Sequence, residues 1–111
     1  MIEALWSVEF QSSFGMRGNG VAVFETGRVF GGDSTMIYVG SFKVENGVIH
    51  SEINVKKYAH VHGMTSVVGL DNFNLKVTGT PAQNEMVLSG HVVEDPTRKI
   101  TIKAIRRAEL P

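Results

Sequence analysis

Two histidines separated by one residue have the types and spacing that come nearest to a metal site. His60 and His62 flank Val61, and an extended backbone would point both imidazoles to one side. A catalytic zinc site takes three protein ligands and an outer shell that orients them. The sequence dictates no third ligand, because His50 and His91 could join the pair only through folding. We therefore predict no metal and no cofactor.

Asp33 is the acidic residue with the most distinctive surroundings. It stands in Gly31-Gly32-Asp33-Ser34, where an aspartate carboxylate commonly accepts backbone N–H groups and shapes a tight turn. A catalytic role would need a base or nucleophile beside it, and the sequence specifies none. The Gly-x-Ser-x-Gly nucleophile elbow is absent, and so is cysteine. We expect Gly31, Gly32 and Asp33 to form a structural turn, and we predict no catalytic residues and no enzyme activity.

Charge and composition exclude several classes of partner. The chain has 11 basic and 11 acidic residues, so we expect no basic face for nucleic acid. No apolar run approaches the roughly 20 residues that span a bilayer. The first ten residues carry Glu3 and Glu9 in place of the basic start and apolar run of a signal peptide. The lack of cysteine is typical of the cytoplasm. We predict a cytoplasmic protein without nucleic-acid or membrane partners.

Strands are the elements that must position these residues, because apolar residues recur at every second position. The pattern predicts strands over 4–11, 21–25, 29–30, 36–44, 48–58, 72–78, 86–93 and 100–105. Residues 12–20 contain three glycines and predict a loop. Residues 60–70 predict an irregular segment that holds a short helical turn or a lid. Asn46-Gly47 predicts a type I′ hairpin turn.

These elements predict one all-β domain over residues 1–111, an antiparallel up-and-down barrel of about eight strands. Most connections span only 2 to 6 residues, which favours consecutive hairpins. Eight strands is about the number at which a barrel fills with side chains or holds one small ligand. Gly40 and Gly90 interrupt strand patterns where a tightly curved sheet can bend. A two-sheet sandwich is the alternative fold.

The inward-facing positions of these strands either pack as a core or enclose a cavity for an apolar ligand. On the strand predicted over 36–44, Val44 is the last of the residues expected to point inward. The candidate cavity residues are Trp6, Val8, Phe10, Met36, Tyr38, Phe42, Ile53, Phe73, Leu75, Met86 and Leu88.

Some apolar residues fall instead on the predicted outer faces. A contiguous patch of them would mark an interface, and a net charge near zero favours self-association. We predict a homodimer that forms through the barrel wall. The candidate interface residues are Leu5, Ile37, Val39, Val87, Val93 and Ile105.

Three segments also carry a family resemblance. They are Ala4-Leu-Trp-Ser-Val-Glu-Phe10, Gly20-Val-Ala-Val-Phe-Glu-Thr-Gly-Arg-Val29 and Gly31-Gly-Asp-Ser-Thr-Met-Ile-Tyr-Val-Gly-Ser-Phe42, followed by the strand that ends at Lys57-Tyr58. Together they resemble the GrlR-type negative regulators of type III secretion, over roughly the first 60 residues. The resemblance implies a lipocalin-like barrel with an apolar interior, a homodimer, and regulation by binding a transcriptional regulator. The hairpin 44–48 holds a single acid where the best-known regulator of that family has an acidic activator-binding stretch, so no activator-binding residues are carried over.

Two functions therefore remain open. One is a non-enzymatic regulator that sequesters a protein partner. The other is a carrier or sensor whose barrel holds a lipid or another small apolar molecule. A co-purified lipid would favour the carrier, whereas a fully packed barrel with a large wall interface would favour the regulator.

Overall fold

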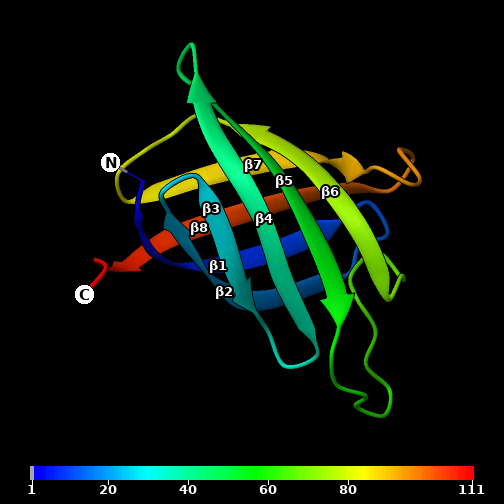
Figure 1. Cartoon of the computed structure of the whole chain (residues 1–111). Coiled ribbons are helices and arrows are strands. Elements are labelled where there is room, and N and C mark those ends of the chain that lie inside the picture. The colour runs from blue at the N-terminus through cyan, green and yellow to red at the C-terminus, as the bar shows by residue number, and fades with distance from the viewer. Residues whose placement is uncertain (1) are drawn as a thin grey trace.

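Eight antiparallel strands close into a barrel in the computed structural model, which describes residues 2–111 (Figure 1). They are β1 (Ala4–Ser12), β2 (Arg17–Glu25), β3 (Arg28–Gly32), β4 (Met36–Glu45), β5 (Val48–Lys57), β6 (Asn72–Gly79), β7 (Glu85–Val92) and β8 (Lys99–Ala108). Each strand pairs with the next along the chain, and β8 pairs with β1. The predicted all-β up-and-down barrel is confirmed, and the sandwich alternative is excluded. None of the described residues forms a helix long and apolar enough to cross a membrane.

The two-residue alternation of the sequence becomes an inside and an outside. In β1, Ala4, Trp6 and Val8 are buried, whereas Glu9 and Gln11 are exposed. Full burial of one large apolar side chain contributes about 1.5–3 kcal/mol, so these inward rows supply much of the folding free energy. The largest fully buried side chains are those of Trp6, Val29, Ile49, Val68, Val77, Leu88 and Val92.

The start of β2 differs from the sequence prediction. A loop over residues 12–20 is wrong, because β2 begins at Arg17 and only residues 13–16 connect it to β1. The glycines of this stretch serve close packing. A Cβ atom on Gly20 would lie 2.6 Å from the hydroxyl oxygen of Tyr38, and one on Gly18 would lie 3.2 Å from Val67 Cγ1. Strand β2 therefore passes close to the side chains that fill the barrel.

Gly31 and Gly32 also lie in a strand, whereas the sequence assigns them to a turn. Neither has a positive φ angle, and both belong to β3. A Cβ atom on Gly31 would lie 2.0 Å from the carbonyl oxygen of Val21, a distance that backbone atoms cannot accommodate. The tight packing of β2 on β3 requires glycine here, and residues 33–35 alone make the connection to β4.

The hairpin between β4 and β5 extends beyond the barrel, at the top of Figure 1. Asn46 and Gly47 have φ angles of 53° and 74°, the positive values that a type I′ turn needs at both central positions. Val44 is 50% exposed on this extension. Its predicted inward position is therefore wrong, because the strand outruns the interior that would bury it.

Candidate functional site

A cavity of about 150 Å³ occupies one end of the barrel. At this end β1 finishes, β2 and β6 begin, and the β3–β4 connection meets the long segment 58–71 (Figure 1). Protein cavities of about this size, when lined by apolar side chains, stay dry and bind benzene. The volume suits one small ring or a short hydrocarbon chain.

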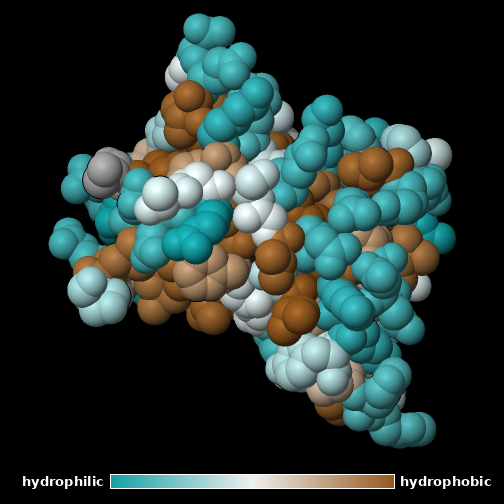
Figure 2. Space-filling model, in the orientation of Figure 1, coloured by the Kyte–Doolittle hydropathy of each residue, from teal (hydrophilic) through white to brown (hydrophobic). Residues whose placement is uncertain are grey.

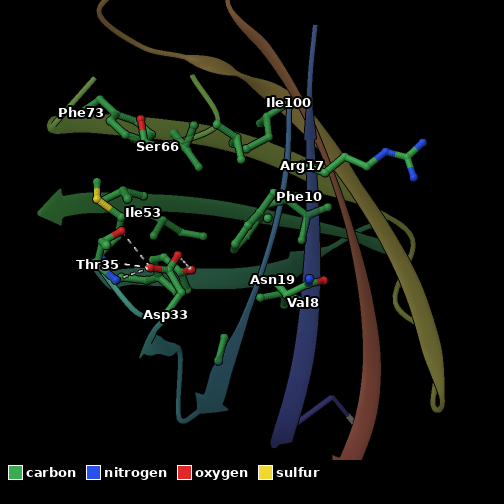
Figure 3. Close-up of a pocket in the computed structure, with 18 of the residues that line it drawn as sticks. Val8, Phe10, Arg17, Asn19, Asp33, Thr35, Ile53, Ser66, Phe73 and Ile100 are labelled. Atoms are coloured by element: carbon green, nitrogen blue, oxygen red, sulfur yellow. Dashed lines mark hydrogen bonds between the residues drawn. The ribbon is translucent and has the colours of Figure 1, made fainter. Parts of the chain in front are cut away.

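Eight of the sequence-predicted cavity residues line this space. They come from five strands, so the barrel closure itself brings them together. The eight are Val8, Phe10, Met36, Tyr38, Ile53, Phe73, Leu75 and Leu88. In Figure 3, Val8 and Phe10 face Ile53 and Asp33 across the pocket, and the Arg17 side chain points away from it.

Trp6, Phe42 and Met86 do not line the cavity. Trp6 is fully buried nearer the opposite end, where its Nε1–H donates a 2.8 Å hydrogen bond to the carbonyl oxygen of Ile2. Its ring lies 6.3 Å from that of Phe24, which in turn lies 5.2 Å from Phe42. Met86 is buried in the core. This aromatic cluster fills one end of the barrel and leaves the other end hollow.

The segment 58–71 forms the wall over the mouth of the cavity. Its residues 64–67 contribute to the lining, and hydrogen bonds within the segment and from Arg98 hold its structure. Ser66 Oγ accepts the Leu70 N–H at 2.9 Å and donates to the Leu70 carbonyl oxygen at 2.5 Å. The Arg98 guanidinium donates to the Val68 carbonyl oxygen at 2.5 Å. This segment is irregular, as the sequence predicts, and contains no helix.

Asp33 supplies the charged group of the lining. Its Oδ1 accepts the backbone N–H groups of Thr35 at 2.9 Å and Met36 at 2.8 Å. Its Oδ2 accepts the hydroxyl of Tyr38, while the Tyr58 hydroxyl donates to the Asp33 carbonyl oxygen at 2.8 Å. Figure 3 shows the Asp33 and Thr35 side chains together on one wall, with dashed hydrogen bonds between the groups. The carboxylate thus both shapes the β3–β4 connection and borders the cavity.

Tyr38 stays neutral at physiological pH. Burial of its ring raises the pKa of the hydroxyl well above its ordinary value, and the hydrogen bond and negative charge of Asp33 raise this pKa further. The ring packs edge-on against Phe10, with centroids 5.4 Å apart. Tyr38 therefore acts here as a fixed wall and hydrogen-bond donor.

The remaining lining residues are ones that sequence reasoning missed. Alternation along β2, β3, β5 and β8 could have revealed those on the strands, whereas no pattern marks those on the segment 58–71. The missed apolar residues are Ala22, Phe24, Val29, Val55, Met64, Val67, Ile100, Ile102 and Ala104.

A second feature is an apolar patch on the outer wall, which we call the β1–β4 patch. The strand register sets Leu5, Val23, Phe30 and Val39 side by side across four strands. A neighbouring row adds two more, and the full patch comprises Leu5, Val21, Val23, Phe30, Ile37 and Val39. Brown surface gathers over β3 and the lower part of β4 in Figure 2, whereas teal covers β5 and β6.

Only part of the predicted interface belongs to this patch. Leu5, Ile37 and Val39 do, and Val39 is 57% exposed. Ile105, on β8, pairs with Ser7 of β1 at the border of the patch. Val87 and Val93 lie elsewhere, on β7 and just after it. Sequence reasoning missed the contributions of β2 and β3, which depend on the register across strands.

The four histidines lie away from the cavity. His60 and His62 are exposed in the segment 58–71, while His50 and His91 are partly buried on β5 and β7. Across residues 2–111, no three His, Cys, Asp or Glu side chains are placed so that they could hold a metal ion.

Comparisons with known proteins support the fold. No protein-family model and no curated protein matches this chain. A solved structure of a redesigned β-barrel resembles it with a TM-score of 0.50 and 12% sequence identity, over 96% of this chain and 91% of the other. At this identity the likeness shows a small eight-stranded antiparallel barrel and nothing about function. The resemblance to GrlR-type regulators stays a prediction.

Proposed function

We propose that this protein is a non-enzymatic binding protein that holds a small, largely apolar molecule inside its barrel. The observation that carries the proposal is the cavity of about 150 Å³, whose walls are mostly apolar and whose floor is closed by packed aromatic rings. Small-molecule sites are typically concave and apolar, with few polar groups that fix orientation. Asp33 and Tyr38 are such groups here.

A binding role suits these two groups better than a catalytic one. Asp33 already accepts two backbone N–H groups, and the Tyr38 hydroxyl already donates to Asp33. A general acid or base should have a pKa near the working pH, and the shift at Tyr38 runs in the opposite direction. We therefore assign both residues to shaping and recognition.

The methionines of the chain provide a direct test. Met36 and Met64 line the cavity, Met86 is buried outside it, and Met16 is on the surface. Titration of methyl-¹³C-methionine protein with benzene or indole should shift the NMR signals of Met36 and Met64 in a saturable manner. The signals of Met86 and Met16 should stay in place. Equal shifts of all four signals, or none, would contradict the proposal.

A second candidate function is favoured by the β1–β4 patch. We propose that a second copy of this chain covers it, since one self-complementary face on each subunit makes a closed two-fold dimer. Exposure of 40% at Phe30 and 49% at Val21 leaves substantial apolar area to bury. Such a dimer, acting in the cytoplasm on a transcriptional regulator, is the function that the sequence resemblance suggests.

A further inference from the structure

The buried hydroxyl groups that border the cavity are already committed as donors, whereas those of Ser34 and Thr65 are exposed. Tyr38 donates to Asp33 Oδ2, and Ser66 donates to the Leu70 carbonyl oxygen. The Thr35 hydroxyl points to Asp33 Oδ1 at 3.4 Å. A hydroxyl that donates its hydrogen in a hydrogen bond can still accept one through its lone pairs. A carboxylate oxygen can accept two hydrogen bonds. The buried polar part of the lining therefore offers acceptors.

Asp33 adds a negative charge to the lining. None of the ion pairs within residues 2–111 includes it, and all its hydrogen-bond donors are neutral N–H and O–H groups. Oδ2 accepts one hydrogen bond, from Tyr38, and so keeps room for a second. A carboxylate in partly apolar surroundings gains most from a cationic partner that also donates hydrogen bonds.

Aromatic rings stand beside this acceptor. Phe10 and Tyr38 pack edge to face at 5.4 Å, and Phe73 lines the same cavity. The faces of aromatic rings attract ammonium groups, most strongly where water is excluded. Arg17 is also among the residues that line the cavity, but its guanidinium points away from the interior in Figure 3 and leaves the acceptor open.

We propose that the ligand is a hydrophobic amine: its hydrocarbon part fills the apolar cavity, and its ammonium group binds Asp33 Oδ2 beside Tyr38. The inference rests on the proposed function and specifies its ligand class. A hydrocarbon group supplies affinity through burial, and the carboxylate selects the charged head. An isosteric carboxylic acid would place two negative charges together.

Three phenyl probes that differ in charge test this assignment in the full chain by isothermal titration calorimetry at pH 7. They are benzylamine, which is cationic, ethylbenzene, which is neutral, and phenylacetate, which is anionic. We expect benzylamine to bind at least about tenfold more tightly than ethylbenzene, and phenylacetate to bind most weakly. Ethylbenzene binding as tightly as benzylamine would overturn the inference and leave the proposed function standing. If none of the three binds, both fail.

Asp33→Asn isolates the contribution of the charge. Asparagine keeps an oxygen for the N–H groups of Thr35 and Met36, so the β3–β4 connection can be retained. We expect the preference for benzylamine over ethylbenzene to fall to less than about threefold. Asp71→Asn is the matched control, because Asp71 is an exposed aspartate that pairs with Lys57 outside the cavity. A preference for benzylamine that survives Asp33→Asn, or that is lost equally in Asp71→Asn, would overturn the inference. If Asp33→Asn does not fold, the three probes on the wild-type protein decide the question.

Discussion

The Tyr38 hydroxyl donates a hydrogen bond to Oδ2 of Asp33, five residues earlier in the chain, while Oδ1 of the same carboxylate accepts two backbone N–H groups. One side chain thereby connects the β3–β4 turn to the interior of the barrel. The turn, the cavity wall and the charged group of the lining form a single hydrogen-bonded unit, and changes at either residue should affect all three.

Tyr38→Phe should lower the free energy of unfolding by about 1–3 kcal/mol, because it removes a donor from a carboxylate in a partly buried setting. Urea unfolding, followed by the fluorescence of Trp6, would measure the change in the free energy of unfolding. Tyr58→Phe is the control, since the Tyr58 hydroxyl also bonds to Asp33 but is exposed. It should cost less than about 1 kcal/mol. Equal losses in the two variants would argue against a special role for the Tyr38 pair.

Stability should fall at alkaline pH through Tyr38. Burial and Asp33 raise the pKa of the folded hydroxyl above the unfolded value of about 10, so the native state keeps a proton that the unfolded chain releases. The stabilisation that the protonated Tyr38 hydroxyl contributes to the folded state is complete below about pH 10. Above that pH it declines by about 1.4 kcal/mol per pH unit. Urea midpoints between about pH 8 and pH 11 would show this decline.

Tyr38→Phe should remove that alkaline slope, whereas Tyr58→Phe should retain it. Absorbance at about 295 nm offers an independent reading, because the folded protein should keep Tyr38 protonated at pH values where the tyrosines of the unfolded chain ionise. Ionisation of both tyrosines before unfolding would contradict the burial of Tyr38.

Gly20→Ala distinguishes a packed strand from a loop. In a loop with ordinary backbone angles the change would be neutral or stabilising by about 0.4–1 kcal/mol. In this barrel the new methyl group would meet the Tyr38 hydroxyl at 2.6 Å and the Gly32 carbonyl oxygen at 2.9 Å. We expect a loss of about 1–3 kcal/mol in urea unfolding. Gly18→Ala, which meets only a valine methyl at 3.2 Å and a more distant ring atom, should cost less.

Val39→Glu tests the β1–β4 patch. Val39 is 57% exposed, so the fold should tolerate a charge there, whereas a dimer that buries the patch should not. Light scattering at high micromolar concentration should give a dimer for the wild type and a monomer for Val39→Glu. Val87→Glu is the matched control, because Val87 is similarly exposed but lies outside the patch. A monomeric wild type would disprove the dimer. A dimer unaffected by Val39→Glu would show that the interface lies on another face.

The alternation of residues was sufficient to predict the barrel and most of its strands and inward faces, but not the start of β2, the end of β3 or the exposed Val44. Phe10, Tyr38 and Phe73 could be assigned to the interior because the two-residue period is local. Features that depend on three-dimensional closure could not be predicted. Gly20 and Gly31 read as loop or turn residues, because a strand that packs closely on its neighbours and a tight turn both require glycine.

The division of the interior into a filled end and a hollow end was also beyond the sequence. Trp6 and Val8 share one face of β1, yet only Val8 reaches the cavity. The difference depends on which residues of other strands stand opposite at each height of the barrel. The outer patch has the same origin, because Val23 and Phe30 join Val39 only through the pairing of three strands.

Calorimetric titration with benzene tests the central claim, that the barrel end is a binding cavity, most directly. The wild type should bind benzene saturably at one site. Ala104→Leu should abolish the binding while the protein remains folded by circular dichroism, because Ala104 is fully buried on the cavity wall and its enlarged side chain would fill the space. Thr101→Leu, which introduces the same side chain on the outer face of the same strand, should leave binding intact. A folded wild type that binds no benzene would contradict the account.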